Sequence, residues 1–540
     1  MKVYDILKKL IAILFLVLFL PILFSIVFVD KGVNYPEYYK LTTYLPNVLL
    51  FLIGAVLILV LVLFGRRLNK TEINKKNSLI VNSILFVCFV VLAIVNIKIS
   101  KCIQFQSAWA DPLNVSYAAR RSLEGHSIDE DTFYYTLAVN NVPIVYFISR
   151  LLKVFDVLKS FPYSEHFFLI EVNCIIISAV GFAGSVILEK VSRKFTPLLV
   201  FVPTYGVLAA LSPWKVFFYT DMAGFFFPVL ALLMYVLYLQ KESWFRYICW
   251  GLFVVFGIFS GLVKPTAFIP LIAVTMVELL RTVCLDSKKL IKSGILLGIL
   301  VCFAVLLLGP YKKHMYSELQ YTYNKDLAQT WTNFLNMGAN GEYMGTCNGE
   351  DSGMMIGKYQ DQPGEVRHKA ELQSFANRIK ERGFWGNISF YHRKLVMTFN
   401  DGTFSWFKEG IANFFSGFGE DISASRLKPF LWSYYWEFGE NFLLFTTIHQ
   451  LFWIMVLTLV PFGTLRLLKK NGNEHNFVFA VVVSVIGVIL FQMLFETRAR
   501  YLICSLPVII FAASFGFEMI CSFKINSKDN KEACDGKASC

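Results

Sequence analysis

The sequence has little charge for its length, and it lacks the cysteine and leader patterns that mark several common protein classes. Only 16% of its 540 residues are Asp, Glu, Lys or Arg, whereas a soluble domain averages about 25%. Its eleven cysteines include no Cys-x-x-Cys pair, which argues against a zinc site or a disulfide framework. The first apolar run is not followed by a small-residue cleavage pattern, so we expect it to be a retained helix rather than a signal peptide.

Apolar residues take the place of the missing charge. They make up 56% of the chain, and the mean hydropathy is +0.56. They come in separate runs of roughly twenty residues, the length that crosses about 30 Å of hydrocarbon. We therefore predict an all-α polytopic membrane protein with about twelve transmembrane helices. The run from Tyr247 to Leu280 is too long for one span, and we divide it at Lys264-Pro265. The predicted spans lie near residues 10–29, 46–64, 79–98, 166–188, 197–213, 221–240, 246–262, 265–283, 293–310, 441–465, 477–495 and 501–523.

The net charge of +13 does not indicate a nucleic-acid partner, because Lys and Arg are concentrated in short loops between the apolar runs. With the spans in this order, these basic loops all fall on one side of the membrane, which the positive-inside rule makes the cytoplasmic side. Both termini are therefore expected in the cytoplasm. The loop charges are Lys2, Lys8, Lys9, Arg66, Arg67, Lys70, Lys75, Lys76, Lys190, Arg193, Lys194, Arg281, Lys288, Lys289, Lys292, Arg466, Lys469 and Lys470.

Two long polar segments then face the opposite side, residues 101–165 and 311–440. Long loops are usually functional or disordered, and the many aromatic residues in these segments favour order, because disordered segments are poor in them. We expect two ordered extracytoplasmic loops on a helical membrane base. The predicted organisation is two N-terminal transmembrane helices in 1–78, a transmembrane core with the first outer loop in 79–310, a large outer loop domain in 311–440, C-terminal transmembrane helices in 441–523 and a cytoplasmic tail in 524–540.

Asp111 is the first candidate site residue, and it lies directly after the third predicted span. An Asp that precedes a Pro can cap the first turn of a helix, which is the structural interpretation. The functional interpretation places Asp111 at the membrane–water boundary, as a general base that acts on an acceptor hydroxyl. Both interpretations stay open at this point.

An acidic triplet and a single aspartate are the next candidate site residues. The triplet Asp129-Glu130-Asp131 most simply forms a solvated turn, with a substrate or metal role as the alternative. Asp221 follows an aromatic segment and opens the next predicted helix. It can cap that helix, or it can serve as a second acidic site residue that faces outward.

Three basic residues stand where a charge is costly or unexpected. Lys264 lies within a long apolar stretch, where the default interpretation is a functional residue with an anionic partner, although a lysine at the end of a span can also snorkel to the interface. Arg498 and Arg500 join the last two spans on the outer side, against the positive-inside trend. Because an Arg fork binds phosphate well, we favour a phosphate site over a plain interfacial turn.

In these segments the chain resembles the GT-C superfamily of polyprenyl-phosphate-sugar glycosyltransferases. The nearest kin would be bacterial relatives of the protein O-mannosyltransferases and of the lipid A aminoarabinose transferase. The mannosyltransferases typically have a Glu after their aspartate, whereas Pro112 stands here, which leaves the acceptor class open. The matching pieces occur in order from about residue 79 onward: the acidic residue after a span (Asp111), the Tyr-Thr-Asp segment that ends at Asp221, the Gly-x-x-Lys-Pro-Thr stretch at Lys264 and the Glu-Thr-Arg-Ala-Arg-Tyr turn at 496–501.

The resemblance implies an inverting glycosyltransferase. Asp111 would deprotonate the acceptor hydroxyl, and Asp221 would be a second acidic site residue. Lys264, Arg498 and Arg500 would bind the donor phosphate and stabilise its charge as the sugar leaves. The partners implied are a polyprenyl-phosphate-linked sugar donor, a glycan, lipid or protein acceptor, and membrane lipid. The implied location is the bacterial plasma membrane, with the active site on the extracytoplasmic side. A divalent metal (Mg or Mn) can be held through acidic residues and phosphate, but no ligand set stands out.

Two other functional classes compete with this hypothesis. A secondary transporter or lipid-linked-glycan flippase would also have about twelve spans, but transporters usually show repeated halves and broken helices at the midplane. No such repeat is apparent, since the large loop falls between the ninth and tenth predicted spans. A receptor or scaffold would not need Lys264 in apolar surroundings. The identities of the sugar and the acceptor cannot be inferred from the sequence.

Overall fold

The all-α membrane architecture is confirmed. The computed structural model describes residues 2–29, 41–68, 72–103, 111–130, 134–158, 164–240, 243–285, 290–359, 361–410, 427–468 and 474–523. These ranges contain helices and no strand, and eleven of the helices in them are long and apolar enough to cross a membrane. The predicted tail 524–540, together with Asp131, Lys70, Lys288, Lys289, Lys469 and Lys470, lies outside the described residues.

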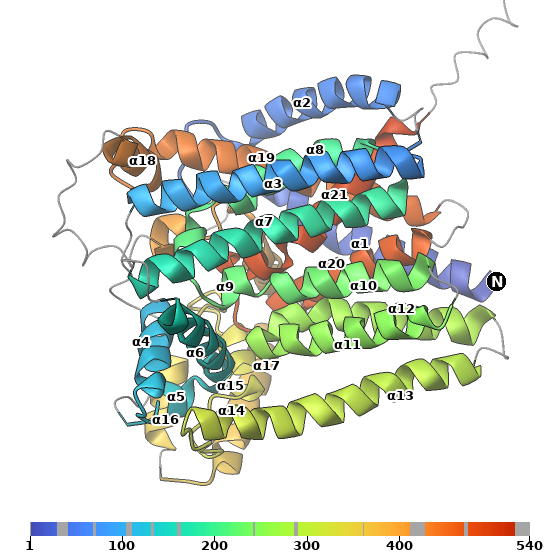
Figure 1. Cartoon of the computed structure of the whole chain (residues 1–540). Helices are drawn as coiled ribbons and strands as arrows, with labels where there is room; N and C mark the ends of the chain where they lie inside the picture. The colour runs from blue at the N-terminus through green and yellow to red at the C-terminus, as the bar shows by residue number, and fades with distance from the viewer. Residues whose placement is uncertain are drawn as a thin grey trace, which may run out of the picture.

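The long helices lie side by side and form the membrane base (Figure 1). Several of them begin or end in a short helical turn that belongs to the same span. They are α1 (Lys2–Phe28), α2 (Asn47–Leu68), α3 (Lys75–Ile103), α7 (Glu165–Ser192), α9 (Thr220–Ala223) with α10 (Phe226–Gln240), α11 (Phe245–Val263), η5 (Pro265–Phe268) with α12 (Ile269–Leu285), α13 (Leu290–Leu306) with η7 (Leu307–Tyr311) and α14 (Lys312–Glu318), α19 (Phe442–Leu465) with η11 (Arg466–Leu468), α20 (Glu474–Leu494), and η12 (Ala499–Ser505) with α21 (Leu506–Cys521).

The fifth predicted span, 197–213, is shorter than expected. It forms α8 (Thr196–Tyr205) and one wider turn, η3 (Gly206–Ala210). Fifteen residues rise about 22 Å, less than the roughly 30 Å of hydrocarbon. The chain then leaves the helix at Ser212 and forms a separate turn, η4 (Pro213–Val216). The apolar run therefore continues past the end of the helix, which is why hydropathy alone extends the span.

The membrane helices at the centre of the base are more buried than those at its edge. The span formed by η12 and α21 is 94% buried over its most apolar 18 residues, whereas the corresponding stretches of α3 and of the α13 span are only 11% and 6% buried. Most of the exposed side chains on α3 and α13 are apolar, as expected for helices that face lipid. The two N-terminal helices are part of the base rather than an appendage. Tyr4 donates to Asn476 at 2.9 Å, and Asn47 donates to Asn400 at 2.7 Å.

Both long polar segments form one layer at the same end of the base, which we call the loop layer. In Figure 1 it lies at the left-hand ends of the long helices, away from the N-terminus. The two segments are joined by backbone and side-chain bonds, including Gln329 N to Leu137 O at 3.0 Å and Thr322 N to Asp129 Oδ2 at 2.9 Å. The elements of the loop layer are α4 (Asp111–Leu123), α5 (Tyr134–Leu137), η2 (Val139–Asn141), α6 (Val142–Val157), α15 (Trp331–Gly338), η8 (Glu350–Met354), α16 (Met355–Lys358), α17 (Gly364–Phe399), η9 (Trp406–Gly410) and α18 (Leu427–Tyr435).

A buried polar cluster organises part of the loop layer. Arg378 makes a forked contact with Asp351, at 2.7 Å to Oδ1 and 3.1 Å to Oδ2. The amides of Asn340 and Asn348 donate to the same carboxylate at 2.8 and 3.1 Å. Burial acts to raise the pKa of Asp351, but these bonds hold it below the ordinary value, so the carboxylate stays charged. A charge satisfied in this way fixes the fold of the layer around it.

The orientation of the base generates a labelling prediction. Because the basic loops lie opposite the loop layer, we expect Cys347, an exposed cysteine of that layer, to face the outside. In single-cysteine variants, a membrane-impermeant maleimide should label Cys347 on intact cells. Cys534 should be labelled only after the membrane is permeabilised. The reverse pattern would show that the orientation is inverted.

Close packing of α19 against α21 generates a stability prediction. A Cβ atom added to Gly516 would lie 2.0 Å from the carbonyl oxygen of Leu459, so the two backbones must move apart. We expect Gly516→Ala to lower the free energy of unfolding by about 1–3 kcal/mol, the usual cost of overpacking.

Gly298→Ala is the matched control, because a Cβ at Gly298 meets no described atom within 4 Å. Alanine is the better helix former, so this variant should unfold at or slightly above the wild-type temperature. Thermal unfolding in detergent compares the two variants directly. Equal unfolding temperatures would contradict the close approach of α19 and α21.

Candidate functional site

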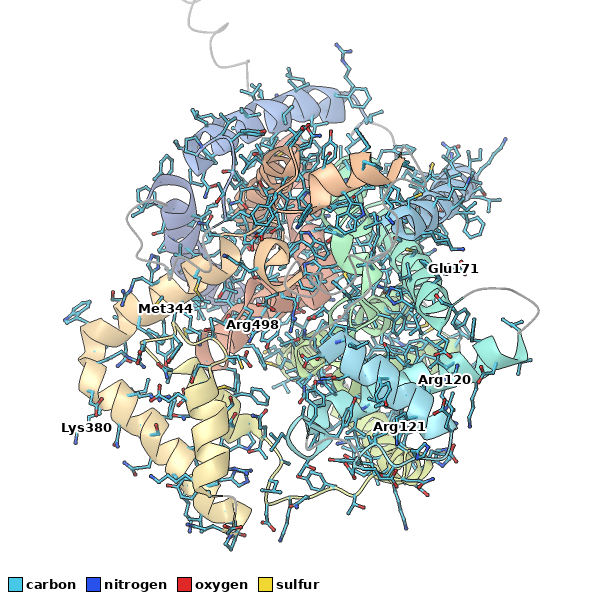
Figure 2. The ribbon with its side chains drawn as sticks, turned by 90° about the vertical axis from the view of Figure 1, so that its left-hand side faces the viewer. Arg120, Arg121, Glu171, Met344, Lys380 and Arg498 are labelled. Carbon is cyan, nitrogen blue, oxygen red and sulfur yellow. The ribbon has the colours of Figure 1, made fainter. Side chains whose placement is uncertain are left out.

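A cavity of about 500 Å³ lies where the loop layer meets the membrane base. Four of the five predicted site residues line it: Asp111, Lys264, Arg498 and Arg500. The fifth, Asp221, is buried next to it and contacts two of the four. In Figure 2, which looks onto the loop-layer end, Arg498 lies centrally, with Met344 and Lys380 on one side and Arg120 and Arg121 on the other.

The interruption of the helix at Lys264, between α11 and η5, places one cation in this cavity. Helix α11 ends at Val263, and Lys264 has an extended backbone (φ −152°, ψ 126°), as expected for a residue before a proline. Its ammonium forms an ion pair with Asp221 Oδ1 and lies 4.7 Å from the centre of the Tyr501 ring. Lys264 is only 8% exposed and Asp221 only 2%. A lysine this deep in an apolar base needs its anionic partner, so snorkelling to water does not describe it.

The turn before α21 supplies the two other cations. Arg500 Nε lies 3.2 Å from Asp221 Oδ2, so Asp221 is shared between Lys264 and Arg500. The two arginines also share one oxygen of Glu409: Arg498 NH1 and Arg500 NH1 each lie 3.1 Å from Glu409 Oε2. The three cations are thereby held close together before any ligand binds.

Glu496 completes this ion network from the same turn. Its Oε1 lies 3.2 Å from Arg498 Nε and accepts a 2.9 Å hydrogen bond from the Tyr501 hydroxyl. The three cations in the described lining of the cavity therefore contact three carboxylates, those of Asp221, Glu409 and Glu496.

Asp111 stands at the first turn of α4, and two tyrosines hold its carboxylate. The hydroxyl of Tyr134 donates to Oδ1 at 2.6 Å, and that of Tyr219 lies 3.0 Å from Oδ2. Burial and the adjacent carboxylate raise the pKa of Tyr134 well above its ordinary value, so its hydroxyl stays protonated. A carboxylate offers about four lone-pair sites, so Asp111 can accept a further proton donor from the cavity.

Tyr219 links Asp111 to the cations. Its hydroxyl contacts Asp111, and its ring centre lies 5.9 Å from Arg500 Cζ. The same hydroxyl lies 2.9 Å from Asn141 Oδ1, which ties η2 to this wall of the cavity. A candidate base and a cluster of cations therefore face one volume at the end of the membrane base.

The remaining walls are mainly aromatic and apolar. Phe491 and Phe495, near the end of α20, line the cavity together with Pro265 and with Phe334 of α15. Trp331, at the start of α15, is 60% exposed although it lines the cavity. The arrangement combines cations for an anionic group with aromatic and aliphatic surface for an apolar chain.

The described residues of the acidic triplet, Asp129 and Glu130, do not belong to the lining of this cavity. Asp129 accepts the backbone N–H of Thr322 and so joins the two segments of the loop layer, whereas Glu130 lies 3.4 Å from His126 Nδ1 of its own segment. The simpler interpretation, a turn near solvent, fits these contacts.

Several residues of the site were not predicted from the sequence. Tyr134, Asn141 and Tyr219 are neutral residues whose role arises only from their position beside Asp111. Glu496 belongs to the turn that carries Arg498 and Arg500, so its proximity to them was a usable signal. Glu409 lies in a polar loop, and nothing in its local sequence indicates its contact with two distant arginines.

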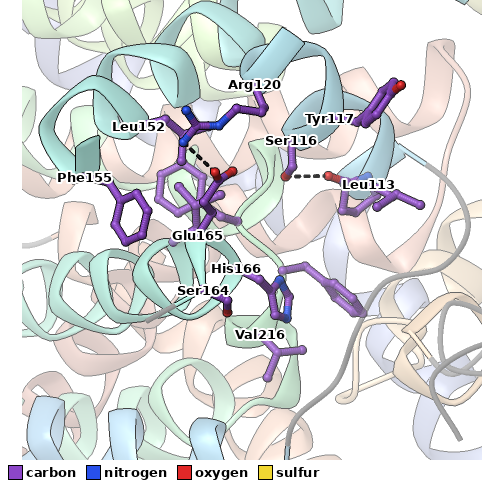
Figure 3. Close-up of a pocket in the computed structure, with 14 residues that line it drawn as sticks. Leu113, Ser116, Tyr117, Arg120, Leu152, Phe155, Ser164, Glu165, His166 and Val216 are labelled. Atoms are coloured by element: carbon purple, nitrogen blue, oxygen red, sulfur yellow. Dashed lines mark hydrogen bonds and ion pairs between the residues drawn. The ribbon is translucent and has the colours of Figure 1, made fainter. Parts of the chain in front are cut away.

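A second cavity, of about 600 Å³, lies on another side of α4 (Figure 3). It is lined largely by apolar side chains, including Leu152 and Phe155 of α6. Arg120 at its edge contacts Glu165 at 2.6 Å and Asp156 at 2.8 Å. Its described lining includes none of the five predicted site residues.

Within the residues that the structure describes, no group of three or more His, Cys, Asp or Glu side chains is arranged to hold a metal ion.

Comparison with known proteins gives a family but no activity. No curated protein and no solved structure matches the chain. One family model matches residues 3–520, nearly the whole sequence, and its description is "conserved hypothetical integral membrane protein". The chain belongs to this family of conserved hypothetical integral membrane proteins.

Proposed function

We propose that the protein is a membrane glycosyltransferase, which moves a sugar from a polyprenyl-phosphate carrier to an acceptor hydroxyl with inversion. The observation that carries the proposal is the shared cavity, in which the Asp111 carboxylate faces a volume also lined by Lys264, Arg498 and Arg500. A phosphate-binding cluster beside a candidate base, at the end of a membrane base, is what transfer from a lipid-linked donor requires.

The donor fits the cavity by its chemistry. Its phosphate would bind the three cations, of which the two arginines offer planar, multidentate donors. The polyprenyl chain would leave along the apolar wall of Phe491 and Phe495 toward the lipid. Exposed Trp331, which also lines the cavity, offers a ring on which a sugar can stack.

The transfer step is a displacement at the anomeric carbon of the donor sugar. The acceptor hydroxyl loses its proton to Asp111, and its oxygen forms a bond to the anomeric carbon of the sugar. The bond from that carbon to the phosphate oxygen breaks, and its electron pair stays on the phosphate. The phosphate thus gains one negative charge, which the adjacent cations stabilise. Attack from the face opposite the phosphate inverts the anomeric configuration.

The location follows from the orientation predicted above. With the basic loops in the cytoplasm, the cavity opens on the extracytoplasmic side of a bacterial plasma membrane. The acceptor would be a glycan, lipid or protein of the cell envelope. Transport of a lipid-linked sugar would need no base at Asp111, so transfer and transport differ in a measurable way.

Asp111→Asn tests the assignment of the base. The amide keeps the size and part of the hydrogen bonding of the carboxylate but cannot take a proton. We expect transfer from a radiolabelled lipid-linked sugar to fall by about 10²-fold or more, while donor binding persists. Lys264→Ala should also weaken donor binding, because that charge acts in both the ground and transition states.

Asp129→Asn is the matched control, since it removes a carboxylate of the loop layer outside the cavity. Its transfer rate should stay near that of the wild type. If Asp111→Asn transfers as fast as this control, Asp111 is a structural residue at the start of α4. No transfer by the wild type with any lipid-linked sugar tested, together with passage of such a lipid between leaflets, would favour the transporter hypothesis instead.

A further inference from the structure

The cations that line the cavity are balanced by carboxylates. Lys264, Arg498 and Arg500 supply three positive charges, and the carboxylates in contact with them supply three negative charges. Asp111 adds a fourth carboxylate to the lining. A polyprenyl monophosphate carries about −1.5 to −2 at pH 7. The described residues of the cavity therefore offer such a ligand well-placed hydrogen-bond donors but little net positive charge.

Glu409 contributes most directly to this balance at the two arginines. One of its oxygens lies 3.1 Å from a terminal guanidinium nitrogen of Arg498 and 3.1 Å from one of Arg500. This bridging place between two guanidinium groups resembles the one that an oxygen of a bound phosphate takes. Glu409 is 8% exposed, so water screens its charge only weakly.

The turn that carries Glu409 is fixed rather than loose. The backbone N–H of Glu409 donates to Ser405 O at 2.8 Å. Asp401 accepts the backbone N–H groups of Thr403 and Ser405 at 2.8 and 2.6 Å. The indole of Trp406, which is fully buried, donates to Tyr435 O at 2.9 Å. The position of the Glu409 carboxylate is therefore built into the fold.

We propose that Glu409 acts as a built-in counter-charge, which positions Arg498 and Arg500 and limits how tightly the cavity holds a polyprenyl phosphate. This inference rests on the proposed function. Transfer converts a singly charged sugar phosphodiester into a more highly charged monophosphate, which three unbalanced cations would retain. A carboxylate that offsets part of their charge lets the product leave, so that turnover continues.

Glu409→Gln tests this inference, because the amide keeps the length of the side chain and one acceptor oxygen but removes the charge. We expect the Kd for farnesyl monophosphate, measured by calorimetry with the full chain in nanodiscs, to fall by about tenfold. That is a modest effect for one charge in a poorly solvated site. The affinity for farnesol, which has the same chain without phosphate, should stay unchanged.

Glu318→Gln is the matched control. Glu318 Oε2 also contacts two cations, Arg150 at 2.9 Å and Lys153 at 3.7 Å, but Glu318 is the last residue of α14 and lies outside the described lining of the cavity. This variant should bind farnesyl monophosphate as the wild type does. If Glu409→Gln does not fold, Glu409→Asp withdraws the carboxylate by one methylene and should bind the ligand more tightly, by a smaller factor.

The outcomes separate the two proposals. A Kd that is unchanged or higher in the folded Glu409 variant overturns the counter-charge role, even if the wild type binds the phosphate. No saturable binding of farnesyl monophosphate to the wild type overturns the proposed function itself. Tighter binding that appears equally with farnesol would also contradict the inference, because the gain would then come from the chain rather than from the phosphate.

Discussion

The cost of holding charge away from water is the constraint on which this site depends. Lys264, Asp221 and Arg500 are each less than 10% exposed, and each contacts an opposite charge. Removal of one member would leave a buried charge without its partner, which costs several kcal/mol in a typical protein. The start of α9, the break between α11 and η5, and the turn before α21 must therefore meet in one arrangement.

The loop layer completes the site through the same kind of interaction between charged or polar side chains. Glu409 reaches the arginines from η9, and Asp111 reaches Tyr219 from α4. The layer is fixed separately by its own polar cluster around Asp351 and Arg378. These contacts place the polar groups of the cavity before a ligand arrives, which is the condition for electrostatic catalysis.

The sequence predicted the parts of this arrangement that have a strong local signal. The hydrophobic runs gave the membrane helices, and Pro265 marked the break after Lys264, where α11 does end. Lys264 and Arg500 stood out because a charge in or next to an apolar run is rare and costly. The end of α8 was misplaced because the apolar composition continues through a turn that is no longer part of the helix.

Contacts between distant segments had no such signal. Glu409 and Arg500 are 91 positions apart, and a glutamate in a polar loop looks like any solvated residue. Tyr219 is one of 25 tyrosines, and only the fold shows that it joins Asp111 to the cations. The cations could thus be named from the sequence, whereas their carboxylate partners and the tyrosines around the candidate base required the three-dimensional arrangement.

The most direct test is an experimental structure of the full chain in a lipid nanodisc with a polyprenyl monophosphate bound. We predict phosphate density within hydrogen-bond distance, about 3 Å, of Lys264 and of at least one of Arg498 and Arg500. The chain should follow the wall of Phe491 and Phe495 into the lipid. Phosphate density in the second cavity beside Arg120, with the cavity at Lys264 empty, would contradict a phosphate site at these cations and the glycosyltransferase built on it.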